Sequence, residues 1–180
     1  MLLSFPQLST ERLLLRQLKI EDAPEIFLLR SDETVNRFID RQRATSIEDA
    51  LEFIHKINTA INNNESMYWG ISTRDDATLI GTICLWNIVP EKETAEIGYE
   101  LIPAYHGKGF MQEAIAKVID HVFNSVGLKT IEAVPRADNE RSVKLLEKNK
   151  FKRDLEAEKR FTDEERTENL VIYSLTKDTR

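Results

Sequence analysis

The chain has 180 residues, of which 41% are hydrophobic, so it suits one compact domain with a real core and excludes a disordered tail. The net charge is -6 and no basic stripe stands out, which argues against a nucleic-acid-binding protein. The single cysteine, Cys84, excludes an internal disulfide and a cysteine-based zinc cluster, and the three scattered histidines indicate no metal site.

The N-terminal residues 1–6 carry no cationic region ahead of an apolar run, so they do not resemble a signal peptide. No stretch is long and apolar enough to predict a membrane span. We therefore expect a cytoplasmic protein without a membrane partner. We expect residues 1–180 to form a single domain.

The first third of the chain predicts one strand and then helices. Residues 10–18 are strand-like, residues 21–29 have helical periodicity, and residues 32–39 indicate a further helical turn or two. Thr45 is predicted to open the next helix through a capping box with Glu48. That helix carries an apolar stripe formed by Ala50, Phe53, Ile54, Ile57 and Ile61.

The middle of the chain changes to the periodicity of strands. Residues 68–73, 79–89 and 95–102 each predict a strand, and turn residues separate them. A Gly-Lys-Gly turn follows, and a helix runs from it to about Val126 with Gly127 as its C-cap. The apolar residues of this helix cover a broad face, as expected for packing on a sheet.

The last part predicts a strand at 130–134, a helix at 139–148 and a terminal hairpin. The two strands of the hairpin are placed at 151–161 and 170–175, around a turn at 162–165. The strand–helix–strand crossover from residue 95 to residue 134 predicts two parallel strands, and the remaining pairs are expected to be antiparallel.

The turn Gly107-Lys108-Gly109 lies between a strand and the start of a helix. The start of a helix presents free amide hydrogens and the positive end of the helix dipole, and glycines let the backbone approach an anion closely. Such a turn can bind a phosphate or pyrophosphate. The longer spacing of a nucleotide P-loop is absent, and Gln112 breaks the dinucleotide-binding pattern. A plain tight turn before a helix remains the alternative.

The stretch from Ala95 to Ala114 resembles the central strand–turn–helix of the GNAT acetyltransferase superfamily. The family pattern Gln/Arg-x-x-Gly-x-Gly/Ala falls on residues 106–111, where His106 stands for Gln/Arg and Met111 for Gly/Ala. The branch that acetylates ribosomal-protein N-termini has a similar Gly-Lys-Gly-Tyr-x-x-Glu-Ala run. The Met111 side chain either crowds the pyrophosphate or points into the core.

The resemblance covers nearly the whole chain. Residues 8–16 and 79–83 resemble the opening strand and the third strand of the ribosomal-protein branch, and residues 139–151 resemble its Asn-x-x-Ser-x-x-x-x-Glu-Lys-x-Gly-Phe segment. Lys150 replaces the glycine of that segment. If its backbone is left-handed, a residue other than glycine costs about 1 kcal/mol or more.

The resemblance implies a GNAT fold, an α/β (α+β) architecture whose mixed, mostly antiparallel seven-stranded sheet has a central parallel pair and flanking helices. It implies that acetyl-CoA is the co-substrate, that no metal is needed, and that an amine attacks the thioester directly without an acyl-enzyme. It also allows a homodimer. By this resemblance, the residues that would contact acetyl-CoA are Tyr99, Leu101, Ile102, His106, Gly107, Lys108, Gly109, Phe110, Met111 and Asn139.

Three chemical tasks follow from that reaction. Glu96 is the candidate base, with Glu100 or water alone as alternatives, since a bulge in the strand could exchange the faces of the two glutamates. A backbone amide near Leu101 is expected to stabilise the oxyanion. Ser142 is expected to serve the leaving thiolate, because Leu146 stands where many relatives carry a tyrosine. Asn139 lies one turn earlier and can cap the helix or face the same ligand.

The acceptor stays open at this stage. The leading hypothesis is the N-terminal α-amine of a protein or peptide, acetylated in the manner of ribosomal proteins. A small amine such as an antibiotic, a polyamine or an amino-acid conjugate is the alternative. A third hypothesis is a catalytically silent acyl-CoA-binding module, motivated by Met111 and Leu146.

Overall fold

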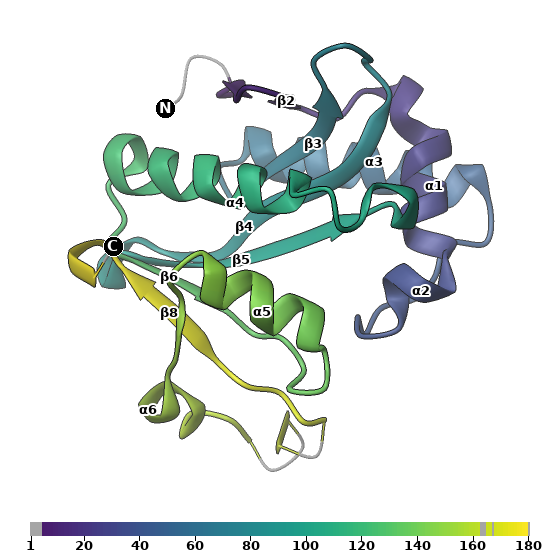
Figure 1. Ribbon diagram of the computed structural model, residues 1–180. Coiled ribbons are helices and arrows are strands. Elements are labelled where there is room, and N and C mark those ends of the chain that lie inside the picture. Colours follow the sequence, from purple (N-terminus) through teal and green to yellow (C-terminus); the bar gives the residue numbers. More distant parts are fainter. Residues whose placement is uncertain (1–4, 163–164, 167, 180) are drawn as a thin grey trace.

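The computed structural model describes residues 5–162, 165–166 and 168–179. An eight-stranded sheet with the order β1-β2-β3-β4-β5-β6-β8-β7 forms its centre (Figure 1). The strands are β1 (Leu8–Ser9), β2 (Leu13–Arg16), β3 (Met67–Thr73), β4 (Leu79–Val89), β5 (Thr94–Leu101), β6 (Thr130–Ala133), β7 (Lys152–Arg153) and β8 (Tyr173–Thr176). The helices are α1 (Ala23–Ser31), α2 (Glu33–Asn36), α3 (Ile47–Asn62), α4 (Phe110–His121), α5 (Glu140–Lys148) and α6 (Leu155–Glu158).

The expected mixed sheet with one parallel pair is confirmed, and that pair is β5–β6. The sheet has eight strands rather than the predicted seven because the opening strand folds back on itself. The Thr10 amide donates to the Leu13 carbonyl at 3.0 Å, and the Thr10 hydroxyl accepts from the Leu13 amide at 2.9 Å. Through this turn, β1 at Leu8–Ser9, which precedes the predicted strand at 10–18, pairs antiparallel with β2.

Two other local predictions were wrong in detail. Ser46, not Thr45, is the N-cap of α3, and its capping-box partner is Asp49 rather than Glu48. The predicted strand at 151–161 is reduced to β7, because Asp154 caps the short helix α6 by accepting from the Ala157 amide at 2.9 Å. Residues 163 and 164 of the predicted hairpin turn lie outside the described residues.

Apolar side chains form two layers of core, one on each face of the sheet. Helix α4 buries Met111, Ala114, Ile115 and Val118 on one face, and the larger core cluster contains them. Helices α1 and α3 cover the other face with the second cluster (Figure 1). None of the helices within the described residues has the length and apolarity that a membrane crossing requires.

The parallel pair opens along its length, and this opening positions the site. Strands β5 and β6 pair from Thr94 with Thr130 to Glu96 with Glu132, and the pairing then stops. Strand β5 continues to Leu101, paired only with β4, whereas the chain beyond β6 leads towards α5 (Figure 1). A row of β5 backbone groups is therefore left without a strand partner on the β6 side.

Candidate active site

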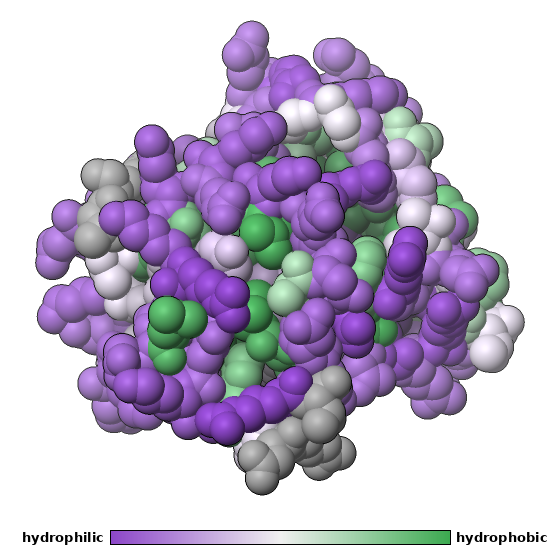
Figure 2. Space-filling model, turned by 60° about the horizontal axis from the view of Figure 1, so that its bottom comes forward, coloured by the Kyte–Doolittle hydropathy of each residue, from purple (hydrophilic) through white to green (hydrophobic). Residues whose placement is uncertain are grey.

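A cavity of about 1430 Å³ lies over the opening between β5 and β6. Its lining comes from β4, β5 and β6, from the start of α5, and from the segment between α1 and α3. On the face of the molecule shown in Figure 2, apolar side chains gather near the centre and hydrophilic side chains frame them. The cavity brings together the predicted residues Glu96, Tyr99, Asn139 and Ser142.

Every second residue of β5 points its backbone amide and carbonyl groups towards this opening. The Ile102 amide donates to the Ile80 carbonyl of β4 at 2.9 Å, so Ile102 points its amide away from the opening. Because backbone groups alternate in direction along a strand, the amides of Tyr99 and Leu101 point towards the opening. Both backbone groups of Ile102 are used within the chain, since its carbonyl accepts from the Tyr105 amide at 2.9 Å. We therefore leave Ile102 out of the proposed binding surface.

The Gly-Lys-Gly turn has the backbone that the sequence predicted. Gly107 and Gly109 have positive φ angles of 75° and 78°, and Gly109 is the N-cap of α4. The amides from Gly107 to Met111 donate to no group within the described residues. A row of free amides at the N-terminus of a twelve-residue helix is suited to an anion such as pyrophosphate.

Arg12 stabilises this turn through contacts that the sequence did not predict. Its guanidinium donates to the Lys108 carbonyl at 3.0 Å and pairs with Glu113 of α4 at 2.7 Å. It also lies 4.6 Å from the centre of the Phe110 ring. Because the Lys108 carbonyl is held by Arg12, the turn keeps its amides and not its carbonyl free for a ligand.

The side chains beside the turn have other partners. Met111 is buried in the core, so it does not crowd the turn and can contribute only its amide to binding. The His106 ring donates from Nε2 to the Leu101 carbonyl at 2.8 Å, and its Nδ1 accepts from Arg141. The Lys108 ammonium lies 5.4 Å from the centre of the Tyr105 ring. The turn therefore presents backbone more than side chains.

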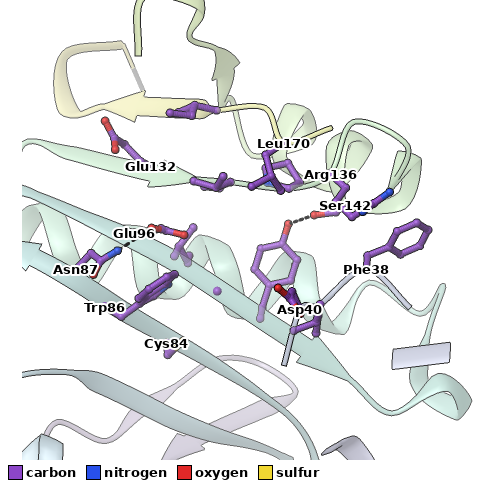
Figure 3. A pocket seen from close by; sticks show the side chains of 18 of the residues that line it. Phe38, Asp40, Cys84, Trp86, Asn87, Glu96, Glu132, Arg136, Ser142 and Leu170 are labelled. Atoms are coloured by element: carbon purple, nitrogen blue, oxygen red, sulfur yellow. Dashed lines mark hydrogen bonds between the residues drawn. The ribbon is translucent and has the colours of Figure 1, made fainter. Parts of the chain in front are cut away.

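Glu96 faces the cavity and has an altered acidity. Its carboxylate accepts from Asn87 Nδ2 at 3.1 Å, as Figure 3 shows. Burial raises the pKa of Glu96 from 4.5 to about 7; the Asn87 hydrogen bond lowers it, and the nearby Glu132 charge raises it. A carboxylate with a pKa near 7 is matched to a base that works at neutral pH.

Glu100, the alternative base, is held differently. It is 9% exposed, and its carboxylate pairs with Arg41 at 2.6 Å. It also accepts from the Thr82 hydroxyl at 3.3 Å. These partners occupy lone pairs of the Glu100 carboxylate, so Glu96 is the freer of the two glutamates.

Ser142 and Asn139 lie at the start of α5 as predicted. Asn139 is the N-cap and accepts from the Ser142 amide at 3.3 Å. The Ser142 hydroxyl lies 2.8 Å from the Tyr99 hydroxyl, across the opening from α5 to β5 (Figure 3). Burial raises the pKa of Tyr99 to about 12, and the Ser142 hydrogen bond opposes this shift. The Tyr99 side chain was missed by sequence reasoning, which had assigned only its backbone a role.

Neither Leu146 nor Cys84 supplies a reactive group to the site. Leu146 is fully buried in the core, so no hydroxyl reaches the site from that position. Cys84 lines the cavity, but burial raises the pKa of its thiol to about 12, which disfavours a nucleophilic thiolate. Within the part of the chain that the structure describes, no cluster of three or more His, Cys, Asp or Glu side chains could hold a metal.

Comparison with known sequences gives a match to the acetyltransferase (GNAT) domain family over residues 12–152. The uncharacterized N-acetyltransferase YoaA of Bacillus subtilis (strain 168) is 39% identical over 150 residues, which cover 83% of this chain and 85% of that protein. The ribosomal-protein-serine acetyltransferase of Escherichia coli (strain K12) is 36% identical over 73 residues, or 41% of each chain.

Solved structures share the fold. The microcin C7 self-immunity acetyltransferase MccE, crystallised with acetyl-CoA and AMP, aligns with a TM-score of 0.74 and 21% identity. The alignment covers 93% of both chains. At this identity the likeness shows the common fold.

Proposed function

We propose that this chain, which belongs to the GNAT acetyltransferase family, acetylates the N-terminal α-amine of a protein or peptide. Acetyl transfer to an amine is the reaction of the family, and GNAT acetyltransferases use acetyl-CoA. The identity of the acceptor is the part that we propose. The observation that carries it is Glu96, a cavity carboxylate whose pKa is raised to about 7.

The residues present fit acetyl-CoA. The free amides from Gly107 to Met111 suit its pyrophosphate, and the β5 amide of Leu101 suits an amide carbonyl of its pantetheine arm. Acetyl-CoA supplies an activated thioester when bound. The chain supplies the donors that hold it, and the cavity that carries Glu96 is lined by β5 from Thr94 to Glu100.

Glu96 is proposed to accept a proton from the acceptor amine, directly or through one water molecule. A free α-amine has a pKa of about 8 and a lysine amine about 10.4, so deprotonation at pH 7 costs about 1.4 kcal/mol and 4.6 kcal/mol respectively. A base with a pKa near 7 suffices for the α-amine and leaves a large penalty for lysine. This difference favours an N-terminal acceptor.

On the other side of the opening, Ser142 and Tyr99 are proposed to serve the leaving thiolate. Their hydroxyls lie 2.8 Å apart, so one can donate a hydrogen bond to the thiolate while it accepts a hydrogen bond from the other. Asn139 holds the helix start that carries Ser142. The Tyr99 amide, which points towards the opening and lies nearer to Glu96 along β5 than the Leu101 amide does, is the proposed donor to the oxyanion.

The similarity to an Escherichia coli enzyme named for ribosomal-protein serine supports a protein N-terminus as the acceptor. A small amine and a silent acyl-CoA-binding module remain the alternatives, and a homodimer remains a prediction from the resemblance.

The test follows free thiol release from acetyl-CoA against peptides that begin with Ser, Ala or Met and against a panel of small amines. Stabilisation by CoA and turnover of peptides with a free N-terminus would support the proposal. Turnover of polyamines or antibiotics alone would contradict the acceptor. CoA binding without any turnover, unchanged by Glu96→Gln, would indicate the silent module.

A further inference from the structure

Charge is distributed unevenly along the cavity. Beside Glu96, the cavity lining includes Glu132, which is paired with Arg160 at 3.0 Å, whereas the α1–α3 segment contributes arginines. These arginines are Arg30, Arg37 and Arg41, and the only carboxylates that line the cavity beside them are Glu100 and Asp40 among the described residues. One end of the cavity is therefore suited to an amine and the other to an anion.

Arg30 is the arginine best placed to meet a ligand. Its guanidinium lies 3.9 Å from the centre of the Phe53 ring, a stacking contact that fixes its orientation. The side chain is half-buried and lines the cavity. In the part of the chain open to description, no carboxylate forms an ion pair with it. Burial lowers the pKa of Arg30, and the Arg41 charge lowers it further.

The neighbouring groups compensate this charge only in part, because the Glu100 charge raises the pKa of Arg30 but the Glu100 carboxylate is paired with Arg41. Arg41 uses Glu100 at 2.6 Å and also donates to the Leu29 carbonyl at 3.1 Å. Arg37 is exposed, and it lies 5.2 Å from the centre of the Phe38 ring. Asp40 is exposed and forms no ion pair within the described segments. A desolvated guanidinium without a partner gains most from an incoming carboxylate, because two parallel hydrogen bonds replace its lost hydration.

We propose that Arg30 binds a carboxylate of the acceptor whose amine faces Glu96. This inference rests on the proposed function and names the acceptor as an amine that carries a carboxylate. Two sources share this chemistry, namely an acidic side chain near the N-terminus of a protein and the free C-terminus of a short peptide.

The separation of Glu96 and Arg30 indicates which residue of the acceptor carries the carboxylate. Arg30 interacts with the charge of Glu100, and Glu100 follows Glu96 by four residues on β5. Four residues of strand span about 13 Å. An extended acceptor covers about 3.4 Å per residue, so an acidic side chain at the third or fourth residue reaches Arg30 when the N-terminal amine is at Glu96.

The experiment compares kcat/KM for matched pentapeptide amides, Ser-Ala-Asp-Asp-Ala and Ser-Ala-Asn-Asn-Ala. We expect the acidic peptide to be acetylated about tenfold more efficiently, since one bidentate ion pair is worth about that factor. Arg30→Gln should remove the difference, measured as the ratio of kcat/KM for the acidic peptide to kcat/KM for the neutral peptide. Arg30→Lys should keep part of it, because lysine lacks the planar fork. The tripeptide Ser-Ala-Ala as free acid and as amide tests the C-terminal source.

The matched control is Arg43→Gln, which removes an equal charge from an exposed residue of the same segment that does not line the cavity. It should retain the tenfold preference. Equal rates for acidic and neutral acceptors, unaffected by Arg30→Gln, would overturn the inference and leave the proposed function intact.

A binding measurement separates the two proposals if neither peptide is acetylated. Trp86 lines the cavity and is 45% exposed, whereas the other tryptophan, Trp69, is fully buried. Peptide binding in the presence of CoA should therefore change the fluorescence of Trp86. About tenfold tighter binding of the acidic peptide, lost in Arg30→Gln, would support the anion site even if the proposed acceptor failed. Equal binding of both peptides would contradict it.

Discussion

The two ends of the proposed active site are built from different parts of the polypeptide. The end assigned to acetyl-CoA consists of backbone amides from the turn at 107–111 and from β5. The end assigned to the acceptor consists of side chains from separate elements, among them Arg30 of α1, Phe53 of α3 and Trp86 of β4. The acetyl-CoA end depends on the backbone conformation of the turn and of β5. The acceptor end depends on particular side chains that contact one another.

This difference explains why the chain can depart from its family at the turn. His106 and Met111 replace the usual residues, but the Met111 side chain packs in the core and the His106 ring is used by Leu101 and Arg141. The turn still has its free backbone amides and the positive φ angles of Gly107 and Gly109. We therefore expect the acetyl-CoA end to tolerate side-chain changes other than at its glycines, and the acceptor end to be sensitive to single side chains.

The largest effect is expected at the acceptor end. Glu96→Gln should lower kcat/KM for an N-terminal peptide by about 100-fold at pH 7, because general-base catalysis is lost. In the wild type, activity should rise with pH through about 7 as Glu96 loses its proton, and this limb should vanish in the variant. Glu91→Gln, which changes an exposed carboxylate outside the cavity lining, is the control. An unchanged pH profile would exclude Glu96 as the base.

The same substitution affects stability with a defined sign. The pKa of Glu96 is about 7 when folded against 4.5 ordinarily, so the folded state retains a proton that the unfolded state loses. The contribution of this group to stability is present below pH 4.5 and is lost as pH rises through about 7. Relative to Glu96→Gln, the wild type should therefore lose unfolding free energy between these pH values, as urea denaturation would measure.

The next largest effect tests the backbone end. Gly107→Ala should weaken CoA binding by about tenfold, because alanine disfavours the positive φ of 75° and shifts the amides of the turn. Gly127→Ala is a matched control, since Gly127 has a φ of 86° and, like Gly107, has open space around an added Cβ. Both variants should lose about 1 kcal/mol of stability. Calorimetric titration with CoA should separate the two variants, because only Gly107→Ala should weaken the affinity. Equal CoA affinities of the two variants would contradict a phosphate-binding role for the turn.

A smaller effect is expected at Lys150, outside both ends. This exposed residue has a φ of 71° where the ribosomal-protein branch has glycine. Lys150→Gly should raise the free energy of unfolding by about 1 kcal/mol and leave kcat/KM unchanged. Chemical denaturation tests this, and a destabilised variant would show that the lysine side chain stabilises the turn by contacts that exceed its strain.

The smallest effect is expected at Met111. Met111→Leu should leave the affinity for CoA within about twofold, because only the amide of this residue faces the ligand. The stability should change by less than about 1.5 kcal/mol, since the two side chains have similar volumes in a core. A marked loss of CoA affinity at unchanged stability would mean that the side chain takes part in binding.

The sequence predicted best the features that depend on neighbouring residues. The strands at 68–73 and 79–89 match β3 and β4 within a residue, because alternation and turn residues mark their ends. The Gly-Lys-Gly turn was also predicted from local chemistry, and the N-cap role of Asn139 was one of the two interpretations left open. The positive φ of Lys150 was raised only as a condition, by the glycine of the resembling segment. Family resemblance added Glu96 and Ser142, whose roles remain predictions.

Features that depend on distant residues were not predictable. The Arg41–Glu100 ion pair joins residues 59 positions apart, and it decides which glutamate is free. The Tyr99–Ser142 contact likewise joins a strand to a later helix. Nothing in the local pattern of α1 indicates that Arg30 stacks on Phe53 and faces the cavity. In the C-terminal segment, Asp154 caps a helix where alternation had indicated a strand.

The most direct test of the central claim offers both kinds of amine in one molecule. A peptide that begins with Ser and contains one internal lysine is incubated with acetyl-CoA, and tandem mass spectrometry locates the acetyl group. The account predicts acetylation of the N-terminal amine, with a rate lowered about 100-fold in Glu96→Gln. Acetylation of the lysine, or an N-terminal rate that is unaffected by Glu96→Gln, would contradict it.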